Sequence, residues 1–218
     1  MLSNICNVEI EKFNFDEFPK YVKILTNYRW KPIVITKALQ KYGSIIYVDS
    51  SVHFRNTNYL RIPSLVNCRS NQNDDVKCTH FPYMLYSYTG HSIHYATMSN
   101  IYRYIPTIKE AMKKTKMYEA GLAYVTPTKE TFEILKWSVL CALEEYCILP
   151  YYAPLHDCNK NANSITPTCH RFDQSVINIL LFNANNYNLQ NYTSGFTNFF
   201  SIQRGFERKP NYGLLKNC

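Results

Sequence analysis

Residues 30–51, with the sequence WKPIVITKALQKYGSIIYVDSS, contain the pattern that decides the fold class. Apolar residues recur at helical spacings up to Leu39, and Gly43 is a typical helix terminator. Pro32 lacks an N–H and disfavours helix before it, so we expect it to divide residues 20–42 into two helices. The apolar strand 45–48 follows. A helix that leads directly into such a strand indicates an α/β fold.

The remaining segments continue this alternation of helix and strand. We predict an extended stretch over 52–65, strands over 83–89 and 120–126, helices over 107–117, 128–147 and 172–182, and loops over 67–80 and 149–168. Thr107 and Glu110 form a capping-box pattern, and Thr128 stands where a helix cap belongs. The order predicts one α/β domain over residues 1–218, with an open mixed sheet flanked by helices.

The composition is that of a globular protein with affinity for anions. Hydrophobic residues make up 46% of the chain, and the net charge of +8 attracts phosphates or acidic surfaces. The chain has only 6 glycines and no glycine-rich phosphate-loop motif. It also lacks any helix-turn-helix or finger signature, so we expect no nucleic-acid partner. The basic cluster at residues 109–116 is typical of a solvated helix face.

The 8 cysteines are irregularly spaced and include no C-x-x-C pair, which argues against a zinc site and favours an oxidising compartment. Cys68 with Cys78, and Cys158 with Cys169, flank polar loops that a disulfide could close. The alternative is that most are free, small apolar residues. No apolar run is long enough to span a bilayer. We expect the secretory pathway, in the Golgi lumen or secreted, with any membrane anchor outside this chain; a cytoplasmic location stays open.

Two carboxylates that are far apart in the sequence, Asp49 and Asp173, stand at the ends of apolar elements. Asp49 follows the strand 45–48 and precedes Ser51, at the end of a strand where open α/β sheets bind ligands. Such a carboxylate can hold a divalent cation, or it can simply cap the following turn. Asp173 begins the apolar helix 172–182, where the helix dipole favours a negative charge whether or not the residue has a further role. Together they suggest a shared cleft.

Basic and imidazole side chains near these carboxylates add further candidates. His170 lies three residues before Asp173 and is a potential metal ligand. Arg29 and Lys31 flank Trp30, and two cations around an indole can bind a phosphate or stack on a base. The alternative for that tripeptide is a helix surface with a buried tryptophan.

The order of these motifs resembles a known enzyme group. Asp173-Gln174, followed by three residues and Asn178, resembles the DQ-x-x-x-N motif of glycogenin-like nucleotide-sugar glycosyltransferases of the GT-A type. In that group an aspartate motif at a strand end lies more than a hundred residues upstream, where this chain has 47–51. Further segments are similar to a little-characterised animal family of glycosyltransferase-like proteins: 30–49, 119–121, 141–143 and 147–148. The resemblance covers residues 28–182.

The resemblance implies a GT-A fold that transfers a sugar from a nucleoside-diphosphate sugar to a hydroxyl of a glycan, protein or lipid. Asp49 and Ser51 would help bind Mn²⁺ or Mg²⁺, with His170 as a further ligand, and the metal would hold the donor diphosphate. Asp173 and Gln174 would be the catalytic residues and face the sugar near its reacting carbon.

The same resemblance assigns substrate binding to Arg29, Lys31 and Asn178, besides Asp49 and Ser51. One departure concerns Ser51, because the family motif has a second aspartate there, and a hydroxyl is the weaker ligand for a hard cation. This departure favours an alternative, a catalytically inactive secreted or lumenal binding protein on the same fold. The positive charge alone supports a third alternative, a protein that binds acidic surfaces.

Overall fold

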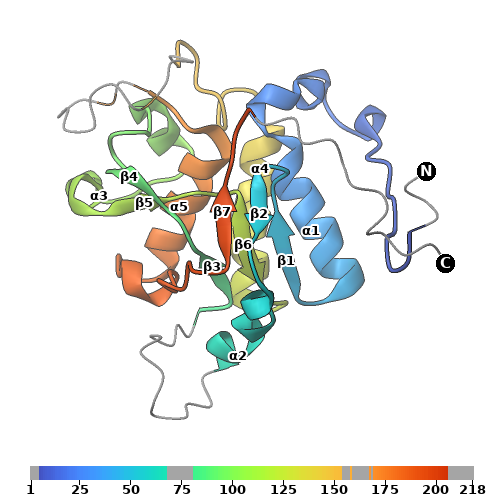
Figure 1. The fold of residues 1–218 in the computed structure, drawn as a ribbon. Helices are drawn as coiled ribbons and strands as arrows, with labels where there is room; N and C mark the ends of the chain where they lie inside the picture. The colour runs from blue at the N-terminus through green and yellow to red at the C-terminus, as the bar shows by residue number, and fades with distance from the viewer. Residues whose placement is uncertain (1–4, 68–80, 154–157, 159–166, 168, 206–218) are drawn as a thin grey trace.

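The computed structural model describes residues 5–67, 81–153, 158, 167 and 169–205. It is a mixed α/β fold, as the sequence predicts, but its sheets are small (Figure 1). A three-stranded sheet has the order β1 (Ile45–Val48), β6 (Leu122–Val125), β3 (Tyr83–Leu85). Two further sheets pair β2 (Val52–Phe54) with β7 (Phe200–Ile202), and β4 (Tyr88–Ser92) with β5 (Lys116–Tyr118). All of these named strand pairs are antiparallel, which differs from the mixed sheet expected.

Three long helices pack side by side: α1 (Trp30–Tyr42), α4 (Lys129–Leu143) and α5 (Phe172–Ala184). Helix α4 lies between the other two and contacts both (Figure 1). The predicted helix start is confirmed, because Thr128 caps α4 and its hydroxyl accepts a hydrogen bond from the Thr131 N–H at 3.3 Å. The described residues also form two short helices, α2 (Ile62–Asn67) and α3 (Lys109–Lys114).

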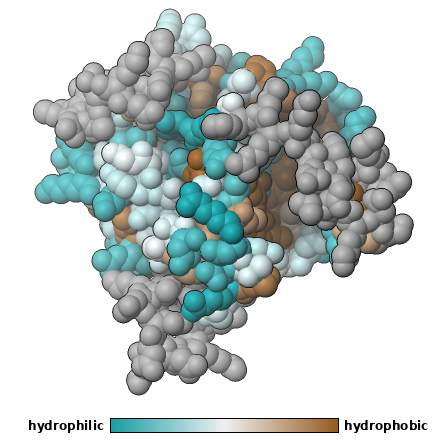
Figure 2. Space-filling model, in the orientation of Figure 1, coloured by the Kyte–Doolittle hydropathy of each residue, from teal (hydrophilic) through white to brown (hydrophobic). Residues whose placement is uncertain are grey.

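The three-stranded sheet is buried on both faces because its residues alternate between two cores. In β6, Ala123 and Val125 point to the large core, which the helices α1, α4 and α5 also line. Leu122 and Tyr124 point to a smaller core, together with Phe199 and other residues of the C-terminal segment. This two-sided burial explains why β6 is a continuous apolar run without polar alternation. In the orientation of Figure 1, hydrophobic residues reach the surface over β1 and β2, beside strongly hydrophilic ones (Figure 2).

Two predictions, that Pro32 divides a helix and that Thr107 caps one, differ from the structure. Pro32 lies inside the first turn of α1, where backbone N–H groups have no intrahelical partner, so the helix already begins at Trp30. Before it, the chain forms two 3-10 turns, Lys20–Lys23 and Leu25–Asn27, in place of the expected first helix. Thr107 does not cap α3, because its hydroxyl donates a hydrogen bond of 2.7 Å to Asn183 Oδ1.

Two other segments also depart from the prediction. The expected helix 107–117 ends at Lys114, and the next residues form the strand β5. The expected extended stretch 52–65 contains β2, but then turns into the 3-10 helix Thr57–Arg61 and helix α2. The predicted loop 67–80 lies almost wholly outside the described residues, as does most of the predicted loop 149–168.

Two disulfides lie near the end of α4 and before the start of α5. Cys158 and Cys169 are bonded, which confirms one of the two predicted pairs, and Cys141 is bonded to Cys147 at the end of α4. The other predicted pair, Cys68 with Cys78, lies outside the described residues. Structural disulfides persist in oxidising compartments, so these bonds fit a secreted or lumenal protein. Within the described ranges, none of the helices has both the length and the apolar character that a membrane span requires.

Candidate functional site

A cavity of about 860 Å³ opens where β1 ends and where α1 and α5 begin. Its lining brings together six of the residues predicted for the site from sequence, namely Lys31, Asp49, Ser51, His170, Asp173 and Gln174. The two distant carboxylates therefore share one cavity, as the sequence suggested. The two remaining predicted residues, Arg29 and Asn178, do not line it.

Lys31 joins the two carboxylates. Its Nζ lies 2.9 Å from Asp173 Oδ2 and 3.2 Å from Asp49 Oδ2, and its side chain is only 6% exposed. Burial opposes the charge on Lys31, but Asp173 and Asp49 outweigh that effect and raise its pKa. Burial raises the pKa of Asp173, although Lys31 acts in the opposite direction. The group therefore contains a fixed ammonium between two carboxylates.

Backbone geometry brings Asp49 to the lysine. The Asp49 N–H donates a 2.7 Å hydrogen bond to the carbonyl of Gly121, which immediately precedes β6. The Tyr47 hydroxyl donates to Asp49 Oδ1 at 2.6 Å, so each carboxylate oxygen has a partner. A β-carbon added at Gly121 would lie 3.0 Å from Asp49 Oδ2. The glycine is therefore needed for the close approach of the carboxylate rather than for its own conformational freedom.

An aromatic pair forms one wall of the cavity. The rings of Tyr28 and Phe172 have centroids 5.9 Å apart, and Lys31 Nζ lies 5.0 Å from the centroid of Tyr28. Both aromatic residues have left-handed backbone conformations, with φ of 55° and 47°. For bulky side chains this conformation costs about 1–3 kcal/mol each, and such strain clusters at functional sites. Tyr28 lies just before α1 and Phe172 is the first residue of α5.

Three charged residues at the cavity escaped the sequence-based assignment of roles. Glu119 and Arg204 form an ion pair of 3.4 Å, and both line the cavity with Arg171. Burial raises the pKa of Glu119, although Arg204 and Arg171 oppose the shift. Arg171 could have been suspected from its place beside His170, and Glu119 from its place in a motif of the resemblance. Nothing in the local sequence singles out Arg204.

Arg29 supports a helix end instead of a substrate. It is fully buried, and its guanidinium donates hydrogen bonds to the carbonyls of Ala142, Glu144 and Glu145. These carbonyls belong to the C-terminal end of α4, which has a partial negative charge and carbonyls without helical partners. The predicted phosphate-binding role of Arg29 does not fit this geometry.

Asn178 and His170 are likewise committed to backbone groups. Asn178 accepts a 2.9 Å hydrogen bond from the Tyr118 N–H and donates to the Tyr118 carbonyl at 2.7 Å, so it fastens α5 to β5. His170 Nδ1 accepts from the Met98 N–H, and Nε2 lies 2.7 Å from the Ile148 carbonyl, which requires the proton on Nε2. Burial lowers the pKa of His170 to about 4, so the ring stays neutral.

The predicted metal ligands do not fit a Mn²⁺ or Mg²⁺ site. Both ring nitrogens of His170 bond to the backbone, and both oxygens of Asp49 are engaged by Tyr47 and Lys31. Ser51 offers a neutral hydroxyl where a carboxylate would be the stronger ligand. Among the described residues, no group of three or more histidine, cysteine, aspartate and glutamate side chains is arranged to hold a metal ion. A protein ammonium lies between the two carboxylates instead.

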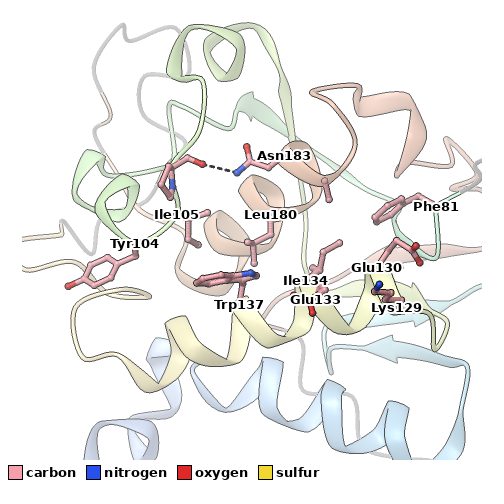
Figure 3. A pocket seen from close by; sticks show the side chains of 12 residues that line it. Phe81, Tyr104, Ile105, Lys129, Glu130, Glu133, Ile134, Trp137, Leu180 and Asn183 are labelled. Atoms are coloured by element: carbon pink, nitrogen blue, oxygen red, sulfur yellow. Dashed lines mark hydrogen bonds between the residues drawn. The ribbon is translucent and has the colours of Figure 1, made fainter.

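A second cavity, of about 600 Å³, lies between α4 and α5. Trp137, Ile134 and Leu180 gather in its middle, and Glu130 and Lys129 lie towards one end (Figure 3). The amide of Asn183 is committed to the Pro106 carbonyl, drawn as a dashed line in Figure 3. Its charged residues, Lys129, Glu130 and Glu133, all belong to α4, whereas the first cavity gathers charged side chains from several segments of the chain.

Comparison with known proteins adds one short match. Residues 1–36 match a family described as "Protein of unknown function (DUF1647)". The matched segment includes Tyr28 and Lys31 of the cavity but not the carboxylates that Lys31 contacts. No curated protein and no solved structure matches the chain.

Proposed function

We propose that this chain is a nucleotide-sugar glycosyltransferase with a GT-A-like arrangement, which works in the lumen of the secretory pathway or outside the cell. The observation that carries the proposal is the meeting of Asp49 and Asp173 at Lys31. These aspartates belong to the two motifs on which the glycosyltransferase resemblance rests. Their convergence in one cavity is what a donor site requires and is not expected of two unrelated helix or turn caps.

The lining of the cavity supports binding of an activated sugar. Its volume falls within the usual range for small-molecule sites, about 300–1,000 Å³. The rings of Tyr28 and Phe172 offer apolar faces to a base or a sugar ring. Asp49, with its side chain 29% exposed, can accept a hydrogen bond from a sugar hydroxyl while it keeps its contact with Lys31.

The reaction proposed is displacement at the anomeric carbon of the sugar. The acceptor oxygen bonds to that carbon while the bond to the diphosphate oxygen breaks, and the electron pair leaves with the nucleoside diphosphate. A carboxylate takes the acceptor proton, and Glu119 suits this role because burial raises its pKa. Asp173, with Gln174 beside it, supplies negative charge that stabilises the positive character of the sugar in the transition state.

A second candidate is a binding protein that holds the same class of ligand without turnover. Lys31 favours it, because an ammonium placed between Asp49 and Asp173 neutralises much of the charge that catalysis would use. Such a protein would keep the cavity and the affinity for nucleotide sugars but would release no nucleotide.

The decisive experiment measures nucleotide release and binding together. The disulfide-bonded protein is incubated with a panel of UDP-, GDP- and ADP-sugars, with glycan acceptors, and free nucleotide is measured. We expect release with one donor class, a loss of about a hundredfold in Asp173→Asn with binding retained, and weakened binding in Asp49→Asn. Asp16→Asn is the matched control, because Asp16 is an exposed carboxylate paired only with Lys23 on the surface.

The outcomes separate the candidates. Binding of a nucleotide sugar without release by the parent protein would favour the binding protein. Neither binding nor release across the panel would rule out both. Release at the parent rate by both Asp173→Asn and Asp49→Asn would show that the chemistry takes place elsewhere.

A further inference from the structure

We infer that the cavity binds the diphosphate of its ligand without a divalent metal, with Lys31 as a built-in cation and Arg171 and Arg204 as the diphosphate-binding residues. This inference rests on the proposed function and specifies how the same site recognises its donor. The charged groups around the cavity support it.

The place of a metal ion is taken by Lys31. A divalent cation that bridged Asp49 and Asp173 would need oxygen ligands at about 2.0–2.6 Å. The Lys31 ammonium already lies 3.2 Å and 2.9 Å from one oxygen of each carboxylate, and its side chain is 6% exposed. A second cation at that point would be repelled by the positive charge of Lys31, which solvent screens little because the side chain is so deeply buried. The lysine therefore provides the counter-charge that a metal would bring.

Two further cations, Arg171 and Arg204, line the cavity and do not pair with Asp49 or Asp173. Arg171 lies directly before α5 and lines the cavity, and its backbone is fixed by hydrogen bonds of its N–H to the Ala96 carbonyl and the Ser175 hydroxyl. Its buried Nε has no hydrogen-bond partner among the described residues. A buried guanidinium nitrogen without an acceptor is costly, and a ligand oxygen would satisfy it.

Arg204 supplies the second guanidinium. It lies two residues after β7 and lines the cavity. Its side chain is 64% exposed, and its partner Glu119 lies 3.4 Å away, at the long end of the range for an ion pair. The Arg204 end of this pair is exposed, so its guanidinium can turn towards a phosphate in the cavity, whereas the Glu119 side chain is only 19% exposed. Guanidinium groups bind phosphate oxygens in a bidentate manner, which a lysine cannot do. Two arginines around one cavity therefore suit a diphosphate.

The test uses calorimetric titration with inorganic pyrophosphate, UDP and GDP, each in EDTA and in Mn²⁺. We expect pyrophosphate and one nucleoside diphosphate to bind with affinities that agree within about threefold in the two buffers. Arg171→Gln and Arg204→Gln should each weaken binding in EDTA at least tenfold. Lys136→Gln is the charge-matched control, because Lys136 pairs with Glu133 on the exposed side of α4, and it should bind as the parent does.

Binding that appears only with Mn²⁺ would overturn the inference while leaving the proposed function intact. Unchanged affinity in the exposed variant Arg204→Gln, together with unchanged affinity in Arg171→Gln, would also overturn it. Pyrophosphate that binds in EDTA while every nucleoside diphosphate fails would support the anion site and contradict the proposed donor.

Discussion

The ammonium of Lys31 lies 2.9 Å from the carboxylate of Asp173, so that one buried ion pair joins the first turn of α1 to the first turn of α5. The helix dipole favours Asp173 at its position but disfavours a cation at the start of α1. Lys31 is therefore held by its partners and not by its own helix. The positions of Lys31, Asp49 and Asp173 are therefore fixed in the folded protein before any ligand binds.

Replacement of Lys31 by methionine should destabilise the protein by about 3–5 kcal/mol, because it leaves two carboxylates without their buried partner. Both side chains of the pair are at least nine-tenths buried, so solvent screens little of this effect. The measurement is urea denaturation at neutral pH. Lys37→Met is the control, because Lys37 pairs with Glu17 at the surface and should cost less than about 1 kcal/mol.

The variant should also respond to pH in a defined direction. Without Lys31, the pKa of Asp173 rises further above that of the unfolded chain, so the folded state binds more protons. A raised carboxyl pKa favours folding at low pH and disfavours it as pH rises through that pKa. Lys31→Met should therefore regain stability when the pH falls from about 7.5 to about 5.5. Equal losses at both pH values would contradict the ionised pair.

Burial of neutral His170 should make folding sensitive to mild acid. Its pKa of about 4 in the folded protein lies below the ordinary value of 6.5, so the unfolded chain binds the proton first. The stabilisation is complete above about pH 6.5 and is lost as pH falls towards 4. Between pH 7.5 and pH 5 the loss amounts to about 2 kcal/mol.

His170→Asn should remove that part of the pH dependence, which urea denaturation at the two pH values can measure. His53→Asn, a substitution in β2, serves as the control and should keep the dependence of the parent. An unchanged slope in His170→Asn would mean that other groups cause it. The substitution should not affect any metal requirement, since neither ring nitrogen is available to a metal.

The sequence predicted those elements whose signal is local. Thr128 marks the start of α4 by a cap, and the apolar runs of β1, β6 and α5 are dense enough to identify without knowledge of the fold. The strand β5 was missed because Lys116–Tyr118 follows a helical pattern directly, and its pairing with β4 depends on residues far back in the chain. Strand pairing of this kind is not encoded within a short window.

The same distinction separates the predicted site residues that line the cavity from those that do not. Asp49 and Asp173 were found because each stands at the end of an element, where its side chain reaches a cavity. Arg29 was assigned to phosphate because its neighbour Trp30 suggested a ligand platform. The carbonyls that Arg29 contacts, at the end of α4, are more than a hundred residues away in the chain. The contacts of Lys31 are equally non-local and appear only in the folded chain.

Gly121 should be sensitive to the addition of a single methyl group. In Gly121→Ala the new carbon would lie 3.0 Å from Asp49 Oδ2, so the carboxylate that contacts Lys31 would have to shift. We expect pyrophosphate affinity to change at least fivefold, while stability changes by less than about 1 kcal/mol because alanine also restricts the unfolded chain. Calorimetry and urea denaturation measure the two quantities. Parent-like affinity would show that the position of Asp49 does not matter for the ligand.

Substitutions of Arg29 should have the opposite effect to Gly121→Ala: they should change stability and leave ligand affinity unchanged. Arg29→Met removes charge-assisted hydrogen bonds to the Ala142, Glu144 and Glu145 carbonyls, of which the bond to Ala142 is buried and the other two are part-buried, so we expect a loss of about 3 kcal/mol. Arg29→Lys keeps the charge but cannot span three acceptors, and it should lose a smaller part. Arg103→Met, at an exposed position, is the control and should change stability by less than about 0.5 kcal/mol.

The affinity of these variants decides how Arg29 acts. A residue that only closes the end of α4 should leave pyrophosphate affinity at the parent value in any variant that remains folded at the temperature of the titration. Loss of affinity in Arg29→Lys with full stability would instead identify Arg29 as a phosphate ligand and contradict the capping role. The buried position of its guanidinium, outside the lining of the cavity, predicts the first result.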